Sequence, residues 1–184
     1  MKEVMSLMIP AEWAIRGVAV LAFDPTGKII MVEETEDKPE YGKYAGMITI
    51  PMETMNPGEM AVEAAVRGFG EEIGEECAIR YPIGFFEIPL LGRRDRVGII
   101  AFFGELTGRS MPREKKGVKA HPGLTEASFQ DTNPFEMRPQ NLEIYADWKK
   151  LSLQVKGSPA GWAWAWRYVR KLIPPGARAW LPRE

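Results

Sequence analysis

Cysteine and histidine are nearly absent from this sequence. Among its 184 residues, Cys77 is the one cysteine and His121 the one histidine. One cysteine cannot form an internal disulfide, which fits a reducing compartment, and no CxxC motif or Cys/His cluster surrounds it. We therefore expect Cys77 to fill a small apolar position in the core. We expect His121, beside Pro122 in a basic stretch, to lie in a loop.

An excess of one charge and long apolar runs are also lacking. The 24 basic and 25 acidic residues leave a net charge of −1, so there is no global attraction to nucleic acid or to an anionic membrane. The N-terminal apolar run is interrupted by Pro10 and makes a poor signal peptide. No stretch approaches the roughly 20 apolar residues of a membrane span. These absences predict a cytoplasmic protein without a membrane span, and they argue against nucleic acid as a partner.

The composition that is left is that of an ordinary globular protein, with 45% apolar and 27% charged residues. A chain of this length suits one domain with an extension. Apolar runs, turn residues and helical spacing predict its elements. The predicted strands are residues 14–23, 28–32, 47–50, 81–91, 97–106 and 124–129, the first two forming a hairpin, with a basic loop at 107–123 and a helix at 139–151. Together with the helix described next, this order indicates an α/β sandwich with a mixed sheet between helices.

The stretch from Pro51 to Gly74, PMETMNPGEMAVEAAVRGFGEEIG, reads as a turn followed by a helix that ends in paired carboxylates. Asn56 is the predicted cap, Pro57 the first helical position, and Glu59 the residue that completes a capping box. At about 100° per residue, one stripe of this helix is apolar and suits packing on a sheet. The members of the stripe are Val62, Ala65, Val66, Phe69 and Ile73. The residues on the opposite side are Arg67, Gly68, Glu71, Glu72 and Glu75. Carboxylates gathered in this way suit a divalent metal ion that holds a diphosphate.

This stretch resembles the Nudix box. The family pattern is Gly, five residues, Glu, seven residues, then Arg-Glu-apolar-x-Glu-Glu-x-Gly-apolar. The residues that match it are Glu59, Arg67, Phe69, Glu71, Glu72 and Gly74. Three positions depart from it: Glu53 replaces the first Gly, Gly68 the Glu after Arg, and Glu75 the last apolar residue. The resemblance covers residues 11–150, which we predict to be a Nudix-like domain, and it implies a Nudix-type α/β/α sandwich with a mixed β-sheet.

The resemblance implies a metal site. In Nudix enzymes, glutamates at the positions of Gly68, Glu71 and Glu72 supply the main ligands of a divalent ion, Mg²⁺ or Mn²⁺. Gly68 removes one negative charge and up to two oxygens, so we expect the two glutamates to hold the metal weakly. Glu53 stands where the family places a glycine carbonyl near the metal, and its carboxylate is the candidate replacement ligand. If only one ligand is missing, the substitution Gly68→Glu should strongly raise hydrolysis.

The resemblance also implies a reaction, in which a water positioned by the metal attacks a phosphorus of a diphosphate linkage. Arg67 and Glu59 would orient the helix and its glutamates by ion pairing. The proton acceptor would be Glu71, Glu72 or Glu126. The candidates for contact with the phosphates are Arg93, Arg94 and Arg96, or the residues of the basic 107–123 loop.

Functions of different classes follow from these residues. One is a Nudix-like hydrolase that cleaves a diphosphate linkage in a nucleoside diphosphate derivative with a divalent metal ion. The alternative is a catalytically impaired Nudix-fold protein that binds a nucleotide or nucleotide-sugar as a regulatory module. A third, a structural interaction domain, depends on the C-terminal segment.

Residues 151–184 form a basic, tryptophan-rich C-terminal extension. Trp162, Trp164 and Trp166 stand at alternate positions, which suits a strand face, whereas the alanine-rich spacing also allows a helix that ends before Pro174. Such a segment can bind a membrane surface or stack on nucleobases. We favour packing onto the domain or onto a partner subunit, as in a homodimer.

Overall fold

The structure is a computed structural model of the chain, and it describes residues 13, 15–90, 96–133 and 135–183. The described strands are β1 (Ile15–Leu21), β2 (Ile29–Glu34), β3 (Ile48–Thr49), β4 (Met52–Thr54), β5 (Glu75–Pro89), β6 (Arg96–Ser110) and β7 (Val118–Leu124). They form a four-stranded sheet in the order β4-β1-β6-β5 and a three-stranded sheet in the order β3-β2-β7. In the larger sheet β1 and β6 are parallel and the other pairs antiparallel, so this sheet is mixed.

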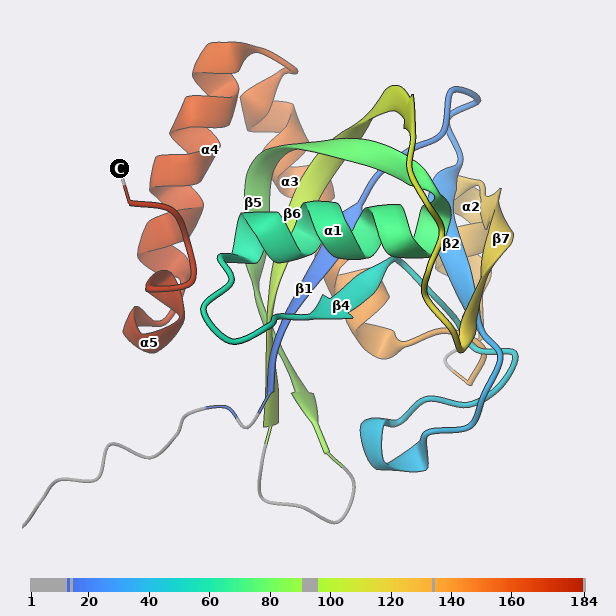
Figure 1. Cartoon of the computed structure of the whole chain (residues 1–184). Coiled ribbons are helices and arrows are strands. Elements are labelled where there is room, and N and C mark those ends of the chain that lie inside the picture. The colour runs from blue at the N-terminus through green and yellow to red at the C-terminus, as the bar shows by residue number, and fades with distance from the viewer. Residues whose placement is uncertain (1–12, 14, 91–95, 134, 184) are drawn as a thin grey trace, which may run out of the picture.

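Helices lie on both sides of the mixed sheet. They are α1 (Ala61–Ile73), α2 (Glu126–Asp131), α3 (Pro139–Val155), α4 (Pro159–Leu172) and α5 (Pro175–Arg178), with a short 3₁₀ helix, η1, at Pro39–Tyr41. Figure 1 shows α1 crossing the front of the mixed sheet, α3 behind it, and α4 and α5 at one end. The mixed sheet and its covering helices confirm the predicted α/β sandwich.

The core is built around the two parallel strands in the middle of the mixed sheet. Residues 18–21 of β1 and residues 99–102 of β6 pair side by side and are almost completely buried. Strands covered on both faces read as continuous apolar runs, which is why the sequence predicts them well. From α1, Phe69 packs into this core with 1% of its surface exposed. Cys77 is also buried, as expected.

The predicted hairpin between the first two strands is wrong beyond its turn. The Gly27 N–H donates to the Asp24 carbonyl at 2.9 Å, so the turn itself forms as expected. After a bridge between Phe23 and Ile29, however, β1 and β2 enter different sheets. The turn therefore links the two sheets of the fold.

The predicted start of the central helix is also wrong. α1 begins at Ala61 and not beside Asn56. Gly58 adopts a φ of 79°, a left-handed conformation that does not fit an α-helix. Glu59 still accepts a hydrogen bond from the Asn56 N–H, at 2.8 Å, but within a turn that precedes the helix.

Much of the predicted basic loop is β-structure. β6 continues to Ser110 and β7 begins at Val118, so only residues 111–117 connect them without regular structure. His121 lies in β7 opposite Met31 of β2, and its prediction as a loop residue is wrong. Pairing with a distant strand overrides the Gly and Pro content of this stretch.

The segment predicted as a strand at 124–129 is strand only at Leu124, the end of β7, and most of it belongs to α2. The Thr125 side chain caps this helix by accepting a hydrogen bond from the Ser128 N–H at 3.2 Å. The cap explains the error, because Thr before a short apolar stretch is typical of both strands and helix starts. The helix predicted at 139–151 is confirmed as α3.

The C-terminal segment is helical, and α4 ends before Pro174. α4 packs on β5, where the Trp166 indole donates to the Arg80 carbonyl at 2.8 Å and the Arg80 guanidinium lies 4.7 Å from the centre of the Trp162 ring. Beyond it, Trp180 meets the ring of Trp13 edge to face, with 5.4 Å between ring centres. Within the described residues, no helix has the length and apolar character needed to cross a membrane.

Candidate functional site

Arg67, on α1, ties the helix to the segment before it. Its guanidinium binds both carboxylate oxygens of Glu59, at 2.8 Å from Nε and 2.9 Å from Nη2, and Nη2 also donates to the Thr54 carbonyl at 3.0 Å. One turn further, the Glu71 carboxylate accepts from Nη1 at 3.3 Å. The hydrogen bonds from Arg67 hold the pKa of Glu59 below its usual value. We name Glu59, Arg67 and Glu71 the Arg67 cluster.

Strand β4 passes close to α1 at Gly68. A Cβ atom added to Gly68 would lie 2.3 Å from the Cβ and 2.6 Å from the Cγ of Glu53. The Glu53 side chain therefore occupies the space that a side chain at position 68 would need. Two separate departures from the family pattern are thus in contact in the fold.

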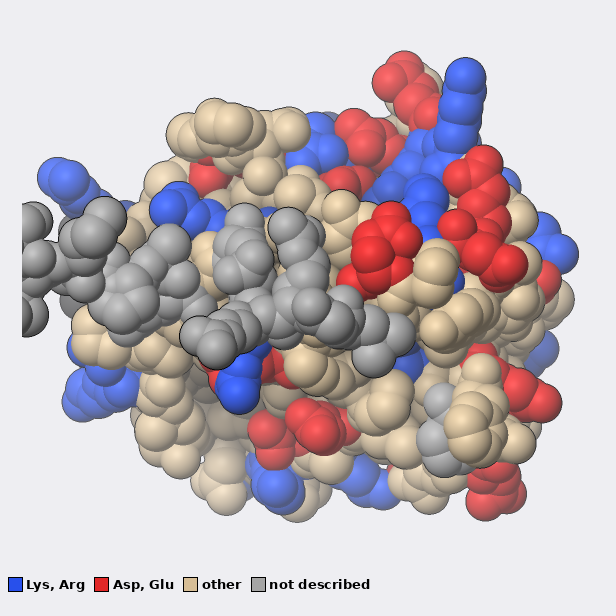
Figure 2. Space-filling view, turned by 90° about the horizontal axis from the view of Figure 1, so that it is seen from below, with Lys and Arg blue, Asp and Glu red and all other residues tan. Residues whose placement is uncertain are grey.

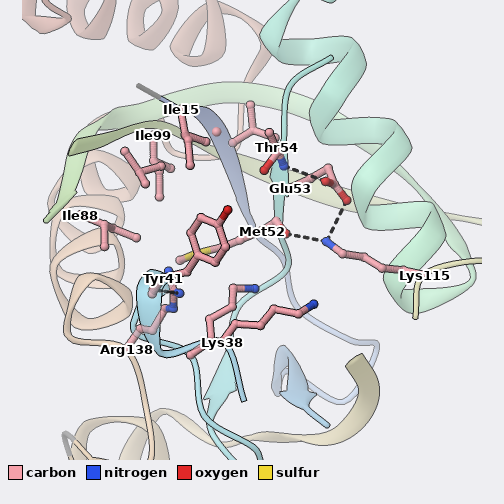
Figure 3. Close-up of a pocket in the computed structure, with 14 residues that line it drawn as sticks. Ile15, Lys38, Tyr41, Met52, Glu53, Thr54, Ile88, Ile99, Lys115 and Arg138 are labelled. Atoms are coloured by element: carbon pink, nitrogen blue, oxygen red, sulfur yellow. Dashed lines mark hydrogen bonds and ion pairs between the residues drawn. The ribbon is translucent and has the colours of Figure 1, made fainter. Parts of the chain in front are cut away.

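The carboxylate of Glu53 binds the ammonium group of Lys115, which comes from the loop between β6 and β7 (Figure 3). Lys115 Nζ donates to Glu53 Oε2 at 2.8 Å, to Glu72 Oε1 at 2.5 Å and to the Met52 carbonyl at 3.0 Å. An ammonium group has three N–H donors, so these oxygens occupy all of them. We name Glu53, Glu72 and Lys115 the Lys115 cluster.

The loop that carries Lys115 is held against the C-terminal end of α1 by its own backbone. The N–H groups of Met111 and Lys115 donate to the carbonyls of Gly74 and Glu71, at 2.9 Å and 3.2 Å. Such carbonyls at a helix end need partners from outside the helix. Gly70 admits the loop, because a Cβ there would lie 2.7 Å from the sulfur of Met111. The second mid-helix glycine is thus what lets the loop approach the helix.

Glu72 is the most deeply buried member of the Lys115 cluster, with 1% of its surface exposed. Burial raises the pKa of Glu72 to about 7, although the nearby charge of Lys115 acts in the opposite direction. Burial also tends to lower the pKa of Lys115, but the carboxylates of Glu72 and Glu53 outweigh it and the pKa is raised. Lys115 therefore stays protonated, and the cluster holds a positive charge at its centre.

The divalent metal ion implied by the sequence resemblance would need the same oxygens. Mg²⁺ takes oxygen ligands, usually carboxylates with waters and phosphates. The oxygens of Glu53, Glu72 and Met52 that converge here already bind Lys115. Over the part of the chain that the structure describes, no three His, Cys, Asp or Glu side chains are placed to hold a metal ion together. In this arrangement the residues do not fit a resident divalent ion.

A pocket of about 290 Å³ opens beside the Lys115 cluster (Figure 3). This volume is close to the lower limit of small-molecule sites, which span about 300–1,000 Å³. One side of the pocket is apolar, formed by Ile15, Met52, Ile88, Val97 and Ile99. The other side is cationic and aromatic, formed by Lys38, Tyr41, Lys43, Lys115 and Arg138. The pocket therefore joins an apolar wall to a concentration of positive charge.

Of these cations, Arg138 is buried and Lys43 is partly buried, with 20% of its side chain exposed. Arg138, just before α3, is 6% exposed, and its Nη2 donates to the Tyr41 carbonyl at 2.7 Å. Lys43 donates to the buried carboxylate of Glu34 at 2.5 Å. Burial lowers the pKa of both, and the charges of Arg138 and Lys115 lower that of Lys43 further. Seen from below in Figure 2, basic and acidic side chains lie intermingled on the surface.

Other residues predicted for the site lie elsewhere. Arg96, at the start of β6, is exposed and pairs with a glutamate of β5 at 2.8 Å, and Arg93 and Arg94 fall outside the described residues. Glu126, on α2, pairs with Lys149 of α3, whose hydrogen bond lowers its pKa. Neither Arg96 nor Glu126 lines the pocket.

Lys38, Lys43 and Arg138 carry no local sequence signal of function. The two lysines stand in a charged stretch without periodicity, and Arg138 is a single cation before a helix. Only the fold brings them together, because Tyr41 and Arg138 are 97 residues apart in sequence. Lys115 does belong to the basic loop predicted to contact phosphates, but its ammonium binds protein oxygens.

Comparison with known proteins identifies the family of the chain. The family model described as the NUDIX domain matches residues 13–148. Among solved structures, the chain is similar to a NUDIX hydrolase from Nitrosomonas europaea, with a TM-score of 0.62 and 17% identity over 74% of this chain and 88% of that one. It is also similar to a MutT protein from Methanosarcina mazei Go1, with a TM-score of 0.57 and 17% identity over 74% of this chain and 93% of that one. A UDP-X diphosphatase gives a TM-score of 0.51 and 12% identity over 74% and 63%.

No curated protein matches the chain. At these identities the solved structures show a shared fold. The family model goes further, because it covers most of the chain and includes both clusters on α1. The chain belongs to the Nudix family.

Proposed function

We propose that the pocket binds a nucleoside diphosphate derivative. Nudix hydrolases generally cleave diphosphate linkages in such compounds with divalent metal ions. The observation that carries the proposal is the buried guanidinium of Arg138 beside the partly buried ammonium of Lys43, opposite an apolar wall. Phosphates would bind at the cationic side, and the nucleoside would lie against the apolar side.

Arg138 has the strongest need for an anion. Among the residues that the structure describes, the Arg138 guanidinium makes no ion pair, and its hydrogen bond goes to a neutral carbonyl. The carboxylate of Glu34 acts on Arg138, but burial outweighs it and the pKa of Arg138 is lowered. A buried charge that is incompletely balanced is unfavourable. A phosphate would supply that charge through paired N–H···O bonds, the geometry for which guanidinium is suited.

Lys43 and Lys38 extend this cationic side. The Lys43 ammonium donates one of its three N–H groups to Glu34, so the other two can bind a ligand. Lys38 stands at the rim, half-exposed, with Glu36 at 3.6 Å. A diphosphate carries several negative oxygens, so more than one of these cations would contact it.

The apolar side suits a nucleoside. Ile88 and Ile99 line it beside the ring of Tyr41, which is 36% exposed. Aromatic rings of this kind stack on nucleobases without requiring a particular base. One structural relative is a UDP-X diphosphatase, which is consistent with this class of ligand.

Calorimetry tests the binding proposal. The wild-type chain would be titrated in EDTA with ADP, UDP, ADP-ribose and UDP-glucose. We expect at least one to bind, and we expect Arg138→Met to weaken that ligand about tenfold or more, a loss of about 1.4 kcal/mol. Arg96→Met removes a cation of the same type outside the pocket and should leave the affinity unchanged. Absence of binding by all four ligands, or equal loss in both variants, would contradict the proposal.

Hydrolysis of the diphosphate linkage is the second candidate function. Membership of the family favours it, and so does the Arg67 cluster, whose members all match the family pattern. Water would attack one phosphorus, and Glu71 or Glu72 would accept the proton, because Glu126 lies away from the pocket. Release of phosphate-containing products from the same four compounds tests it. Release of products without added metal would indicate metal-independent hydrolysis, and release only with added metal would indicate metal-dependent hydrolysis. No release under either condition would contradict hydrolysis.

The metal-dependent form makes a further demand. Mg²⁺ or Mn²⁺, held weakly by Glu53, Glu71 and Glu72, would require Lys115 to leave the oxygens that it binds. This form therefore predicts that turnover rises when Lys115 is replaced by a neutral residue.

A homodimer in the cytoplasm completes the proposed setting. Along α4, Trp164, Tyr168 and Leu172 are exposed at spacings of four residues, and the first two rings stack with 4.9 Å between their centres. A second copy of the chain would bury this stripe, which belongs to the proposed extension at residues 151–184. Light scattering on the wild type and on Tyr168→Ser tests the association.

A further inference from the structure

We infer that the Lys115 ammonium is a built-in replacement for the divalent metal ion, so that this chain binds the phosphates of its ligand without a metal. The inference deepens the proposed function of the same site, and it rests on that function only for the identity of the ligand. Its evidence lies in the Lys115 cluster itself.

The oxygens around Lys115 form a cation site. Two carboxylates, from β4 and α1, and the Met52 carbonyl point at one position within 3.0 Å of Nζ. Oxygens of these two kinds are what Mg²⁺ binds in proteins. The position is supplied by a cation covalently tethered to the chain. A free metal ion would have to compete with a partner that never diffuses away.

The ammonium group differs from a metal ion in one decisive way. Mg²⁺ has six coordination positions and usually keeps several for water and substrate phosphate. Lys115 has three donors, and protein oxygens take all three. It can neutralise the buried carboxylates, but it offers no position at which a water or a phosphate would bind. Contact with phosphate is therefore left to Arg138 and Lys43.

The departures from the family pattern fit this arrangement together. Gly68 leaves room for the Glu53 side chain, which supplies one of the oxygens that bind Lys115. Gly70 leaves room for Met111, whose loop carries Lys115 to its position. A chain that had merely lost one metal ligand would need neither feature. The two glycines, the added glutamate and the lysine act as one arrangement.

Titration with Mn²⁺ alone, followed by electron paramagnetic resonance, tests the inference. The free ion gives a strong signal that falls when it binds. We expect no saturable binding to the wild type at concentrations up to about 1 mM, an affinity worth about 4 kcal/mol. Lys115→Met frees the oxygens of Glu53 and Glu72. We expect this variant to gain one Mn²⁺ site, with an affinity at least about tenfold higher than the 1 mM limit set for the wild type. Lys116→Met, a matched change at the exposed neighbour, should behave like the wild type.

Two results would overturn the inference. One is saturable Mn²⁺ binding by the wild type with the affinity of the Lys115→Met variant. The other is no gain of Mn²⁺ binding when Lys115 is removed, because the oxygens would then not be a cation site. The wild-type titration needs no folded variant, and Lys115→Gln, which keeps N–H donors but no charge, serves if Lys115→Met does not fold.

This test is separate from that of nucleotide binding. It uses the metal alone, so its failure leaves the calorimetric result for ADP, UDP and their derivatives untouched. Conversely, a chain that binds none of those compounds would still show whether Lys115 excludes Mn²⁺ from its site.

Discussion

The Arg67 cluster and the Lys115 cluster lie at neighbouring parts of α1, each with one cation among carboxylates, yet they relate to the family in opposite ways. Every member of the Arg67 cluster stands at a matching position of the Nudix pattern. In the Lys115 cluster Glu72 matches, Glu53 replaces a glycine, and Lys115 lies beyond the pattern altogether. One cluster matches the pattern throughout, and the other matches it only at Glu72.

The comparison separates positioning from charge balance. Arg67 holds α1 to the preceding segment through a two-point bond with Glu59, a task that does not depend on any ligand. The carboxylates of the Lys115 cluster need a cation, because Glu72 is buried and charged groups are costly to bury alone. A metal ion can be that cation, and so can a lysine. The second cluster therefore has a role that either kind of cation can fill, whereas the first has a role that only its own residues fill.

Removing Lys115 should have the largest effect on stability. Lys115→Met deprives Glu72 of the ammonium group that it binds, and we expect the free energy of unfolding at pH 8 to fall by about 3 kcal/mol. The raised pKa of Glu72, about 7, makes this loss depend on pH. At pH 5.5 the folded wild type already holds Glu72 protonated, so the loss should be smaller there. Urea denaturation at both pH values measures it.

Lys116→Met is the matched control for that experiment, since Lys116 is exposed. Its effect should stay below about 0.5 kcal/mol at either pH. Two results would contradict the prediction: an equal loss of unfolding free energy in the two variants, or a loss in Lys115→Met that does not change with pH. Either would mean that Lys115 does not stabilise the charge of Glu72.

Removing Arg67 should cost somewhat less and show a different pH dependence. We expect Arg67→Met to lower the free energy of unfolding by about 2 kcal/mol, because Glu59 and Glu71 lose their partner in a half-buried position. The pKa of Glu59 is lowered, so its contribution is present above its unfolded value, about 4.3, and disappears only in more acidic solution. The loss should therefore be equal at pH 5.5 and pH 8. Arg96→Met, which breaks an exposed pair, should cost below about 0.5 kcal/mol.

Restoring the family residue at position 68 should have a smaller effect, of a sign that the sequence does not suggest. Gly68→Glu places a side chain where Glu53 already lies, and we expect a net loss of about 1 kcal/mol with no rise in hydrolysis. The exchange of both residues, Glu53→Gly with Gly68→Glu, removes the overlap and should recover most of that loss. Urea denaturation of the single and double variants measures the coupling. A Gly68→Glu variant as stable as the wild type would mean that Glu53 moves aside freely.

The fold was largely predictable because its central elements are regular. The apolar runs of β1 and β6 and the spacing of α3 carry their own signal in the sequence. β7 was missed because its strand character comes from pairing with β2, more than 80 residues earlier. Gly58 set the start of α1, and its left-handed backbone outweighed the capping signal at Asn56.

The site was predictable only where a linear pattern reports it. Glu59, Arg67, Glu71 and Glu72 stand at fixed spacings, and the last three lie on α1 with Glu59 in the turn before it. Lys115, which binds Glu72, comes from elsewhere in the chain, by a contact that depends on loop conformation. The lysine loop reaches α1 through backbone hydrogen bonds to helix carbonyls, which no side-chain pattern encodes. In the sequence, Glu53 and Gly68 are two separate departures from the family pattern. In the fold they are in contact, because the Glu53 side chain fills the space beside Gly68.

Replacing Glu126 should have the smallest effect on ligand affinity, because this residue belongs to neither cluster. It is exposed on α2 and paired with Lys149, away from the pocket lining. We expect Glu126→Gln to leave the affinity for the best nucleotide within about twofold of the wild type, less than about 0.5 kcal/mol, because exposed ion pairs contribute little and no phosphate would meet this carboxylate. Calorimetry beside Arg138→Met measures it under identical conditions. A loss as large as that of Arg138→Met would mean that α2 closes over the ligand and that the site extends beyond the two clusters of α1.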